Sequence, residues 1–414
     1  MPRTANKVNL ARMKSPLSRA EFIALIAMMF ATIAFSIDAM LPALPEIGSE
    51  LSPDAPNRAQ LILTSFVLGI GVGTFFTGPL SDAFGRRRVI VWGSVLYVGA
   101  AALAYFSTSL EVVLAARVLQ GLGAAAPRIV SLAVVRDLYS GREMARIVSV
   151  AMMIFTIFPA FAPLIGAGVI ALAGWRSIFL AFILFSIVSV GWMWLRLPES
   201  LAVEDRRPFR APLLVHAVRE MFAHPAVRLS IVVQSLCLGI LFSMLSMVHP
   251  IYEVVFDRAE SFPYWFGAVA LVSGSGSLVN AALVVRIGMR RMVTWSLGAQ
   301  IVMAGAMVPI GMAGLPNDWL FGLFLFWQAY VFFMAGTTMG NLNAIAMEPM
   351  GHIAGMAAST ISGIATIAAV VIAAPIGLMF NGSILPLSLG IFCLSGLGFL
   401  LMLGMARVEA RVLP

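Results

Sequence analysis

The most regular feature of this chain is a series of long apolar runs separated by short polar intervals. A helix needs about 20 apolar residues in succession to cross the hydrocarbon core of a bilayer. Twelve runs are of about this length, so the pattern predicts twelve transmembrane helices and an even number of crossings. The predicted spans are residues 21–41, 59–80, 89–107, 111–134, 145–171, 176–196, 226–249, 262–286, 292–313, 318–340, 351–378 and 384–407.

The composition excludes a water-soluble globule. Hydrophobic residues make up 60% of the 414 residues and charged residues only 11%, and the mean hydropathy is +0.96. So few charges cannot cover the surface of a soluble protein of this size. Because a helix satisfies its own backbone hydrogen bonds in lipid, the expected fold class is an all-α membrane protein.

The distribution of basic residues predicts the orientation in the membrane. The net charge of +8 could indicate nucleic acid binding, but the arginines and lysines gather at span ends. One side would hold both termini and most basic residues, whereas the other would hold only Arg58, Arg176 and Arg258. Cytoplasmic loops carry the excess of Lys and Arg, so both termini are predicted to be cytoplasmic and no nucleic acid partner is expected.

The longest polar interval, Leu197 to Pro225, follows the sixth span and divides the chain into two sets of six. A duplication is also indicated by the loops after spans two and eight, where Gly85 aligns with Gly288 at an offset of 203 residues. Two pseudo-symmetric six-helix bundles are typical of transporters that open to each side in turn. The predicted organisation is a cytoplasmic tail at 1–20, bundles at 21–196 and 226–407, a cytoplasmic linker at 197–225 and a cytoplasmic tail at 408–414.

The chain shows no pattern typical of an enzyme or a cofactor site. We find no nucleophile paired with a base, no zinc-ligand spacing and no phosphate-binding loop, so no metal, no cofactor and no catalysis are expected. Glycine-rich stretches such as residues 69–73 lie inside predicted spans, where small residues let helices pack closely. Cys237 and Cys393 also lie in spans and are expected to be inert thiols.

Several motifs resemble those of a known transporter family. Residues 78–88, Gly-Pro-Leu-Ser-Asp-Ala-Phe-Gly-Arg-Arg-Arg, are similar to the signature loop of the major facilitator superfamily. Residues 117–121 resemble its fourth-span motif in proton-coupled members, and residues 159–168 resemble its fifth-span antiporter motif. Residues 38–45, together with 136–139, are similar to the bicyclomycin and chloramphenicol resistance (Bcr/CflA) branch of twelve-span drug:proton antiporters.

This resemblance implies the major facilitator fold and export of small, often amphipathic molecules across the bacterial inner membrane. Inward proton flow would drive the export, and the cargo could be a drug or a metabolite. The implied partners are the substrate, protons and the lipid bilayer, and we expect a monomer. An alternative within transport is a carrier for a specific anionic metabolite or siderophore-like compound, with Arg117 and Arg128 as the clamp.

The signature loop is the candidate conformational gate. Asp82 and the arginines Arg86, Arg87 and Arg88 would pair with each other and with helix ends of the opposite bundle, closing the cytoplasmic side. A solvated run of orienting charges would also explain the three arginines. It would not explain Asp82 or Gly85, so we expect a gate, with Gly78 as part of the same motif.

Asp38 is the candidate proton site, because a carboxylate inside an apolar span is costly and seldom occurs without a use. It lies about 6 Å below the outer end of its span, and Arg117 lies at a similar depth, about 9 Å, in span four. Arginine keeps its proton and can hold a carboxylate ionised until a proton or a cationic substrate competes. We therefore expect Asp38 to take the proton, with Arg117 and Gln120 as its modulators; the alternatives are a static ion pair or an interfacial Asp38.

Arg128 departs from the family pattern and is a candidate substrate ligand. It follows Arg117 by eleven residues, which places it on nearly the same helix face and about 16 Å closer to the cytoplasm. An arginine in a cavity of low dielectric can bind a carboxylate in bidentate fashion, so an anionic cargo is indicated. The alternative is an arginine that extends to the cytoplasmic surface.

The fifth span carries Pro159, Pro163 and Gly166, which predict a bend in the antiporter motif. Ala162 and Ala167 stand where the family shows glycines, so the match is imperfect. An ordinary proline kink would also fit this pattern.

Overall fold

The computed structural model describes the backbone of residues 17–206 and 211–412. It describes their side chains except at 145, 156, 211, 213–217, 351–355 and 406–412. All regular secondary structure in these ranges is helical, and twelve helical segments are long and apolar enough to cross a membrane. This confirms the predicted fold class and the predicted number of spans. Most of the two predicted tails lies outside the described residues.

The first six spans form one bundle, which we call the N-bundle. A single helical turn follows α1 and leads into a short helix, α2, which covers the end of α1. The helices of the N-bundle are α1 (Arg19–Asp38), α2 (Leu44–Leu51), α3 (Leu61–Phe84), α4 (Arg86–Phe106), α5 (Leu110–Leu138), α6 (Gly141–Ala173) and α7 (Ser177–Arg196).

The last six spans form the C-bundle, and the linker between the bundles contains one more helix, α8 (Ala211–Ala223). The predicted eighth span is one segment of membrane-spanning length, Phe262–Ile287, whose two halves meet at Gly274, where φ and ψ stay helical. The helices of the C-bundle are α9 (Pro225–Pro250), α10 (Phe262–Ser273), α11 (Ser275–Ile287), α12 (Met289–Met312), α13 (Asn317–Met347), α14 (Ala354–Leu378) and α15 (Leu385–Val412).

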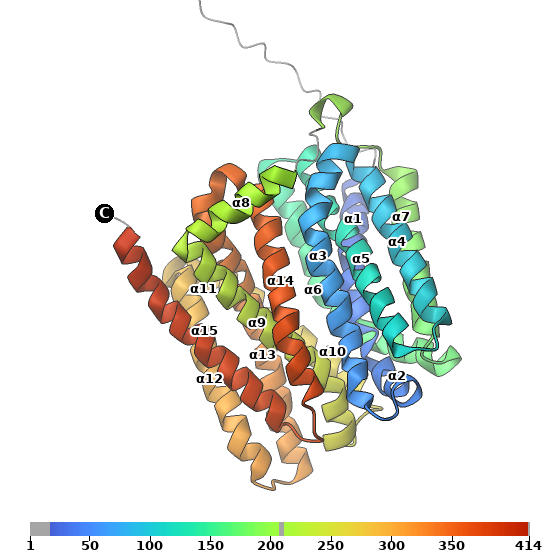
Figure 1. Ribbon diagram of the computed structural model, residues 1–414, viewed down its shortest axis with the longest axis vertical. Coiled ribbons are helices and arrows are strands. Elements are labelled where there is room, and N and C mark those ends of the chain that lie inside the picture. The colour runs from blue at the N-terminus through green and yellow to red at the C-terminus, as the bar shows by residue number, and fades with distance from the viewer. Residues whose placement is uncertain (1–16, 207–210, 413–414) are drawn as a thin grey trace, which may run out of the picture.

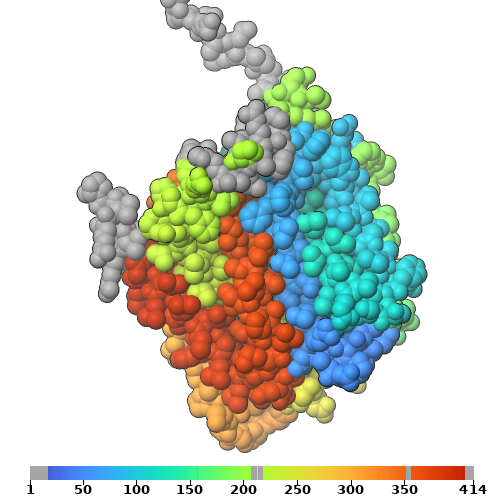
Figure 2. All heavy atoms as spheres, viewed as in Figure 1, coloured from blue at the N-terminus to red at the C-terminus, as the bar shows by residue number. Residues whose placement is uncertain are grey.

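The two bundles stand side by side with their helices roughly parallel (Figure 1). The linker helix α8 and the start of α1 lie at one end, which we call the linker face; α2 lies at the other end, which we call the far face. Contacts between the bundles are made by α3 with α14 and by α6 with α10. Figure 2 shows α14 and α3 in contact along the front of the molecule.

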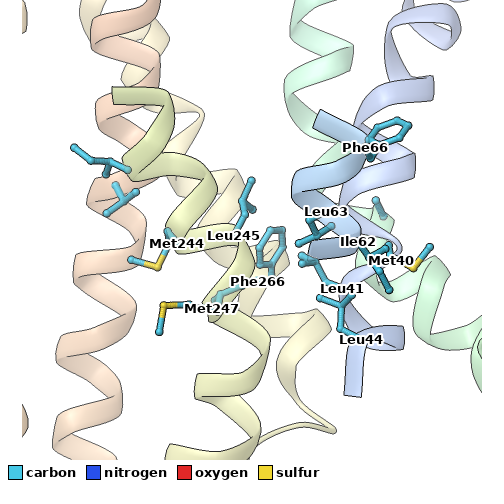
Figure 3. Close-up of a cluster of buried hydrophobic side chains, with 14 of the residues drawn as sticks. Met40, Leu41, Leu44, Ile62, Leu63, Phe66, Met244, Leu245, Met247 and Phe266 are labelled. Carbon is cyan, nitrogen blue, oxygen red and sulfur yellow. The ribbon is translucent and has the colours of Figure 1, made fainter. Parts of the chain in front are cut away.

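The bundles are sealed against each other toward the far face by apolar side chains (Figure 3). Leu41 and Leu63 of the N-bundle face Leu245 of the C-bundle, and all three are buried. At the same face Asn57 Nδ2 donates a hydrogen bond of 2.7 Å to the backbone carbonyl of Phe380 across the interface. The far face is therefore closed in this structure.

Within the N-bundle, glycines let α5 pass very close to α3 and α4. A β-carbon on Gly121 of α5 would lie 2.0 Å from the carbonyl oxygen of Phe66 on α3, and one on Gly69 would lie 2.0 Å from the carbonyl of Val118. On the α4 side, a β-carbon on Gly123 would lie 2.4 Å from the carbonyl of Gly93. Lipid offers no hydrophobic force between helices, so this backbone contact holds the three helices together.

We predict that Gly121→Ala lowers the thermal stability of the protein, because its methyl group has no space without separating α3 from α5. The expected loss is about 1–3 kcal/mol, the usual cost of overpacking. The matched control is Gly99→Ala on α4, where a β-carbon would meet no atom within 4 Å. Thermal unfolding of the two variants in detergent measures the difference, and equal unfolding temperatures would contradict the packing account.

Candidate functional site

Arg117 lies at the centre of the N-bundle and is fully buried. Its guanidinium donates to the backbone carbonyl of Ser36 at 2.8 Å, to the carbonyl of Ile62 at 3.3 Å and to Gln120 Oε1 at 2.7 Å. It also stacks over the ring of Phe66 at 4.2 Å. Carbonyl oxygens and an aromatic face thus take the place of a carboxylate partner for this buried cation.

Two hydroxyl groups extend this network to α4. Ser36 Oγ donates to the carbonyl of Thr32 at 2.7 Å and lies 2.6 Å from the hydroxyl of Tyr97. Because the serine proton is already used, the tyrosine donates to the serine. The network therefore joins α1, α3, α4 and α5 through Ser36 and Arg117.

Asp38 is the last residue of α1 and is 5% exposed. Little of its side chain is exposed, because the chain continues into α2 and because α6 packs on the next residue. A β-carbon on Gly166 of α6 would lie 2.2 Å from the carbonyl oxygen of Ala39. Among the described residues, no hydrogen bond or ion pair reaches the Asp38 carboxylate.

The structure therefore does not bring Asp38 and Arg117 together as an ion pair. The guanidinium bonds instead to the carbonyl of Ser36, two residues before Asp38 on the same helix. Sequence reasoning placed the two residues at one depth but could not find this competing acceptor. Because Arg117 already contacts α1 within one turn of Asp38, its guanidinium is close to a second acceptor, the Asp38 carboxylate.

Arg128 is exposed although it lies well inside α5. Its neighbours on the same helix face, Ala124 and Ser131, are fully buried, and Ser131 contacts Met29 of α1. This side of α5 therefore faces α1, although Leu132, one turn after Arg128, is exposed like the arginine. The described residues offer its guanidinium no hydrogen bond and no carboxylate, so Arg128 differs sharply from Arg117.

The signature loop forms a charge cluster at the linker face. Arg86 is 7% exposed; its Nε donates to Asp137 at 2.9 Å, and its Nη1 donates to Ser81 Oγ at 2.7 Å and to Asp82. Arg87 stacks over the ring of Trp194 at 3.7 Å, and Arg88 is exposed. The expected pairing inside the loop is present, but the bonds described for it stay within the N-bundle and its linker.

Sequence reasoning missed Glu199, which belongs to the start of the linker. Its carboxylate accepts hydrogen bonds from the backbone N–H groups of Arg86 at 2.8 Å and Arg87 at 3.1 Å. It thus caps the first turn of α4, where an anion is favoured by the helix dipole. The signal in the sequence was a lone acidic residue soon after a span, which does not indicate what it will cap.

This cap explains why glycine precedes α4. Gly85 has a φ of +98°, which a residue with a side chain rarely adopts, and a β-carbon there would lie 2.6 Å from Glu199 Oε2. Gly288 in the C-bundle has a similar φ of +90°, but a β-carbon there would meet nothing within 4 Å. The two related loops share a backbone shape and differ in the cap. Gly78, the other motif glycine, also has open space beside it.

The fifth-span motif lies on α6, which remains one continuous helix through Pro159 and Pro163. Gly166 provides the close contact with α1 described above. Ala160 precedes Gly166 on the same helix and lies against the C-bundle. A β-carbon on Gly267 of α10 would lie 2.5 Å from the carbonyl oxygen of Ala160. The motif therefore contacts both the end of α1 and the opposite bundle. The sequence analysis predicted a bend in this helix but neither of these contacts.

The C-bundle has a polar contact between α13 and the π-helical turn that follows α9. Tyr252 donates to Gln328 Oε1 at 2.9 Å within a cluster of aromatic rings. His249, one turn earlier, is buried, and its Nδ1 lies 3.9 Å from Glu253. Across the described residues, no group of three His, Cys, Asp or Glu side chains could hold a metal ion.

Twelve spanning helices in two bundles, with a buried arginine and a buried aspartate inside one of them, are typical of a membrane transporter. Comparison with known proteins agrees with this class. The model of the Major Facilitator Superfamily matches residues 24–373, so the chain belongs to that superfamily. This confirms the family that the sequence motifs indicated.

Related proteins place the chain near drug-resistance transporters. It is 27% identical over 269 residues to a bicyclomycin resistance protein homolog from Haemophilus influenzae, covering 65% of this chain and 67% of the relative. It is 25% identical over 355 residues to multidrug resistance protein D from Escherichia coli, covering 80% and 82%. The solved structure of the xylose transporter XylE from E. coli, partially occluded and inward-open, matches with a TM-score of 0.71 at 12% identity, covering 93% and 97%.

We predict that Glu199→Ala destabilises the linker face by about 1 kcal/mol, the usual effect of losing a helix cap. The matched control is Glu204→Ala, because Glu204 is an exposed residue of the same linker. Thermal unfolding of both variants in detergent gives the comparison. If Glu199→Ala and Glu204→Ala unfold alike, the cap contributes nothing to stability.

Proposed function

We propose that this protein is a proton-coupled exporter of small amphipathic molecules, with its linker face in the cytoplasm. The excess of basic residues at that face supports the orientation. In that orientation the closed far face is periplasmic. The names of the bicyclomycin and multidrug resistance relatives support export and a bacterial inner membrane location.

The observation that carries the proposal is the isolation of Asp38. An ionised carboxylate in an apolar interior without a cation or hydrogen-bond donor is very costly. We infer that Asp38 carries a proton in this state. A group that must be neutral in one state and can be ionised in another is what proton coupling requires.

Arg117 supplies the second arrangement. It holds the carbonyl of Ser36 while Asp38 is protonated, and it turns to the Asp38 carboxylate when the proton leaves. Gln120 stays bonded to the guanidinium and limits its movement. Substrate arriving from the cytoplasm favours proton release, the loaded protein opens to the far face, and a periplasmic proton returns Asp38 to its neutral form.

We predict that Asp38→Asn abolishes coupled transport, because asparagine keeps the shape of the protonated acid but cannot exchange its proton. Proton movement on adding lipophilic cations or phenicols to proteoliposomes with an imposed pH gradient should fall to the level of empty liposomes. Exchange of a transported compound in the absence of a gradient should persist.

The matched control is Asp54→Asn, since Asp54 is exposed in the segment between α2 and α3. It should behave as wild type. If Asp38→Asn still moves protons as wild type does, Asp38 is structural and the proton site lies elsewhere.

A second candidate function is transport of an anionic compound, and the state of Arg128 favours it. This arginine is exposed and donates no hydrogen bond to the described residues, whereas Arg117 is already satisfied by two carbonyls and Gln120. The two arginines therefore do not form a double clamp in this state. A cargo with one carboxylate would bind at Arg128 alone, as a charge-assisted bidentate pair.

We predict that Arg128→Gln weakens the apparent affinity for organic anions about 10- to 100-fold, the range for losing a hydrogen-bonded charge. Affinity for lipophilic cations should be unchanged or better. The matched control is Arg136→Gln, an exposed arginine at the end of the same helix. Uptake of labelled anions and cations into inverted vesicles separates the two classes, and equal losses for both would reject the anion site.

A further inference from the structure

The closed far face contains a glutamine with no hydrogen bond. Gln60 is 3% exposed, and within the described part of the chain neither its Nε2 nor its Oε1 has a hydrogen-bond partner. It ends the turn before α3 and lies against the C-bundle, because a β-carbon on Gly377 of α14 would be 2.6 Å from Gln60 Oε1. Both polar atoms are therefore enclosed by the contact between the bundles.

A serine of the C-bundle at the same place is also unsatisfied. Ser246 of α9 is 1% exposed, and its hydroxyl has no partner. A β-carbon on Gly377 would lie 3.6 Å from its Cβ, so Gln60 and Ser246 converge on one glycine. A cavity of about 10 Å³ lies beside Ser246, at the lower limit for one water molecule, but Gln60 does not line it.

A buried polar atom without a hydrogen bond destabilises the state in which it is buried. When the bundles separate at the far face, water reaches Gln60 and Ser246 and this penalty disappears. The apolar contacts of Leu41, Leu63 and Leu245 favour closure, so the two effects oppose each other across one interface.

We propose that Gln60 and Ser246 are gate residues that set how readily the far face opens. Their unsatisfied groups weaken the closed interface and bring the two conformations closer in free energy, which rapid alternation requires. The neighbouring Asn57 shows that the interface can satisfy an amide, since it bonds to the carbonyl of Phe380. This inference goes beyond the proposed function, because it needs alternate opening of the two faces but neither proton coupling nor a particular cargo.

The chain offers a matched control within one bundle. Gln300 of α12 is fully buried, and both atoms of its amide also lack partners. It lies inside the C-bundle, where its surroundings stay together in both states. Gln300→Met should therefore raise stability without changing the balance between the two faces, whereas Gln60→Met should change that balance.

The experiment is hydrogen–deuterium exchange by mass spectrometry on the full chain in lipid nanodiscs, with no substrate added. For Gln60→Met we expect amides of residues 41–63 and 376–384 to exchange about tenfold more slowly than in wild type. Ser246→Ala should slow them in the same direction by a smaller factor and serves as the second variant. Gln300→Met should leave the exchange rates of these far-face amides unchanged when they are compared with the rates at the linker face.

Slower exchange at the far face in both interface variants, with Gln300→Met unchanged, supports the proposal. Unchanged or faster far-face exchange in correctly folded Gln60→Met and Ser246→Ala overturns it. Equal slowing by Gln300→Met also overturns it, because the effect would then be general stabilisation. Proton movement by Asp38→Asn is measured separately, so failure of the coupling proposal and failure of the gate proposal are distinguishable.

Discussion

The architecture of the N-bundle depends on the close passage of α5 between α3 and α4. The glycines at 69, 93, 121 and 123 replace side-chain contacts by backbone contacts. Because lipid gives helices no hydrophobic reason to associate, such contacts supply the packing energy, and they also fix the rotation of α5. That rotation turns Arg117 toward the carbonyls of α1 and α3 and leaves Arg128, three turns later, exposed.

The treatment of buried polar groups follows from this arrangement. Arg117 sits where three helices are closest and is satisfied by neutral acceptors. Asp38 sits at a helix end covered by α2 and α6 and has no such acceptor or donor. The contrast between a satisfied cation and an isolated acid near the end of α1 gives the site two possible pairings, and only one of them occurs in this structure.

The span pattern was predictable because about 20 apolar residues are needed wherever a helix crosses lipid, and the signature motifs identified the superfamily. Helix faces were only partly predictable, since Arg117 and Arg128 do lie on one helix, as their spacing indicated, but Arg117 is buried and Arg128 is exposed. The partners were not predictable. The carbonyl of Ser36, the cap by Glu199 and the enclosure of Gln60 arise from residues distant in sequence, and a single chain does not indicate which backbone atoms will lie beside a side chain.

The cap on α4 has a consequence for the linker. Glu199 belongs to the segment that joins the bundles, yet it completes the first turn of a helix in the N-bundle and occupies the space that Gly85 leaves open. The start of the linker is therefore part of the folded N-bundle, and the tether proper begins only after it. A reporter domain inserted between α7 and Glu199 would separate the cap from its helix, whereas one inserted closer to α8 would leave this contact whole.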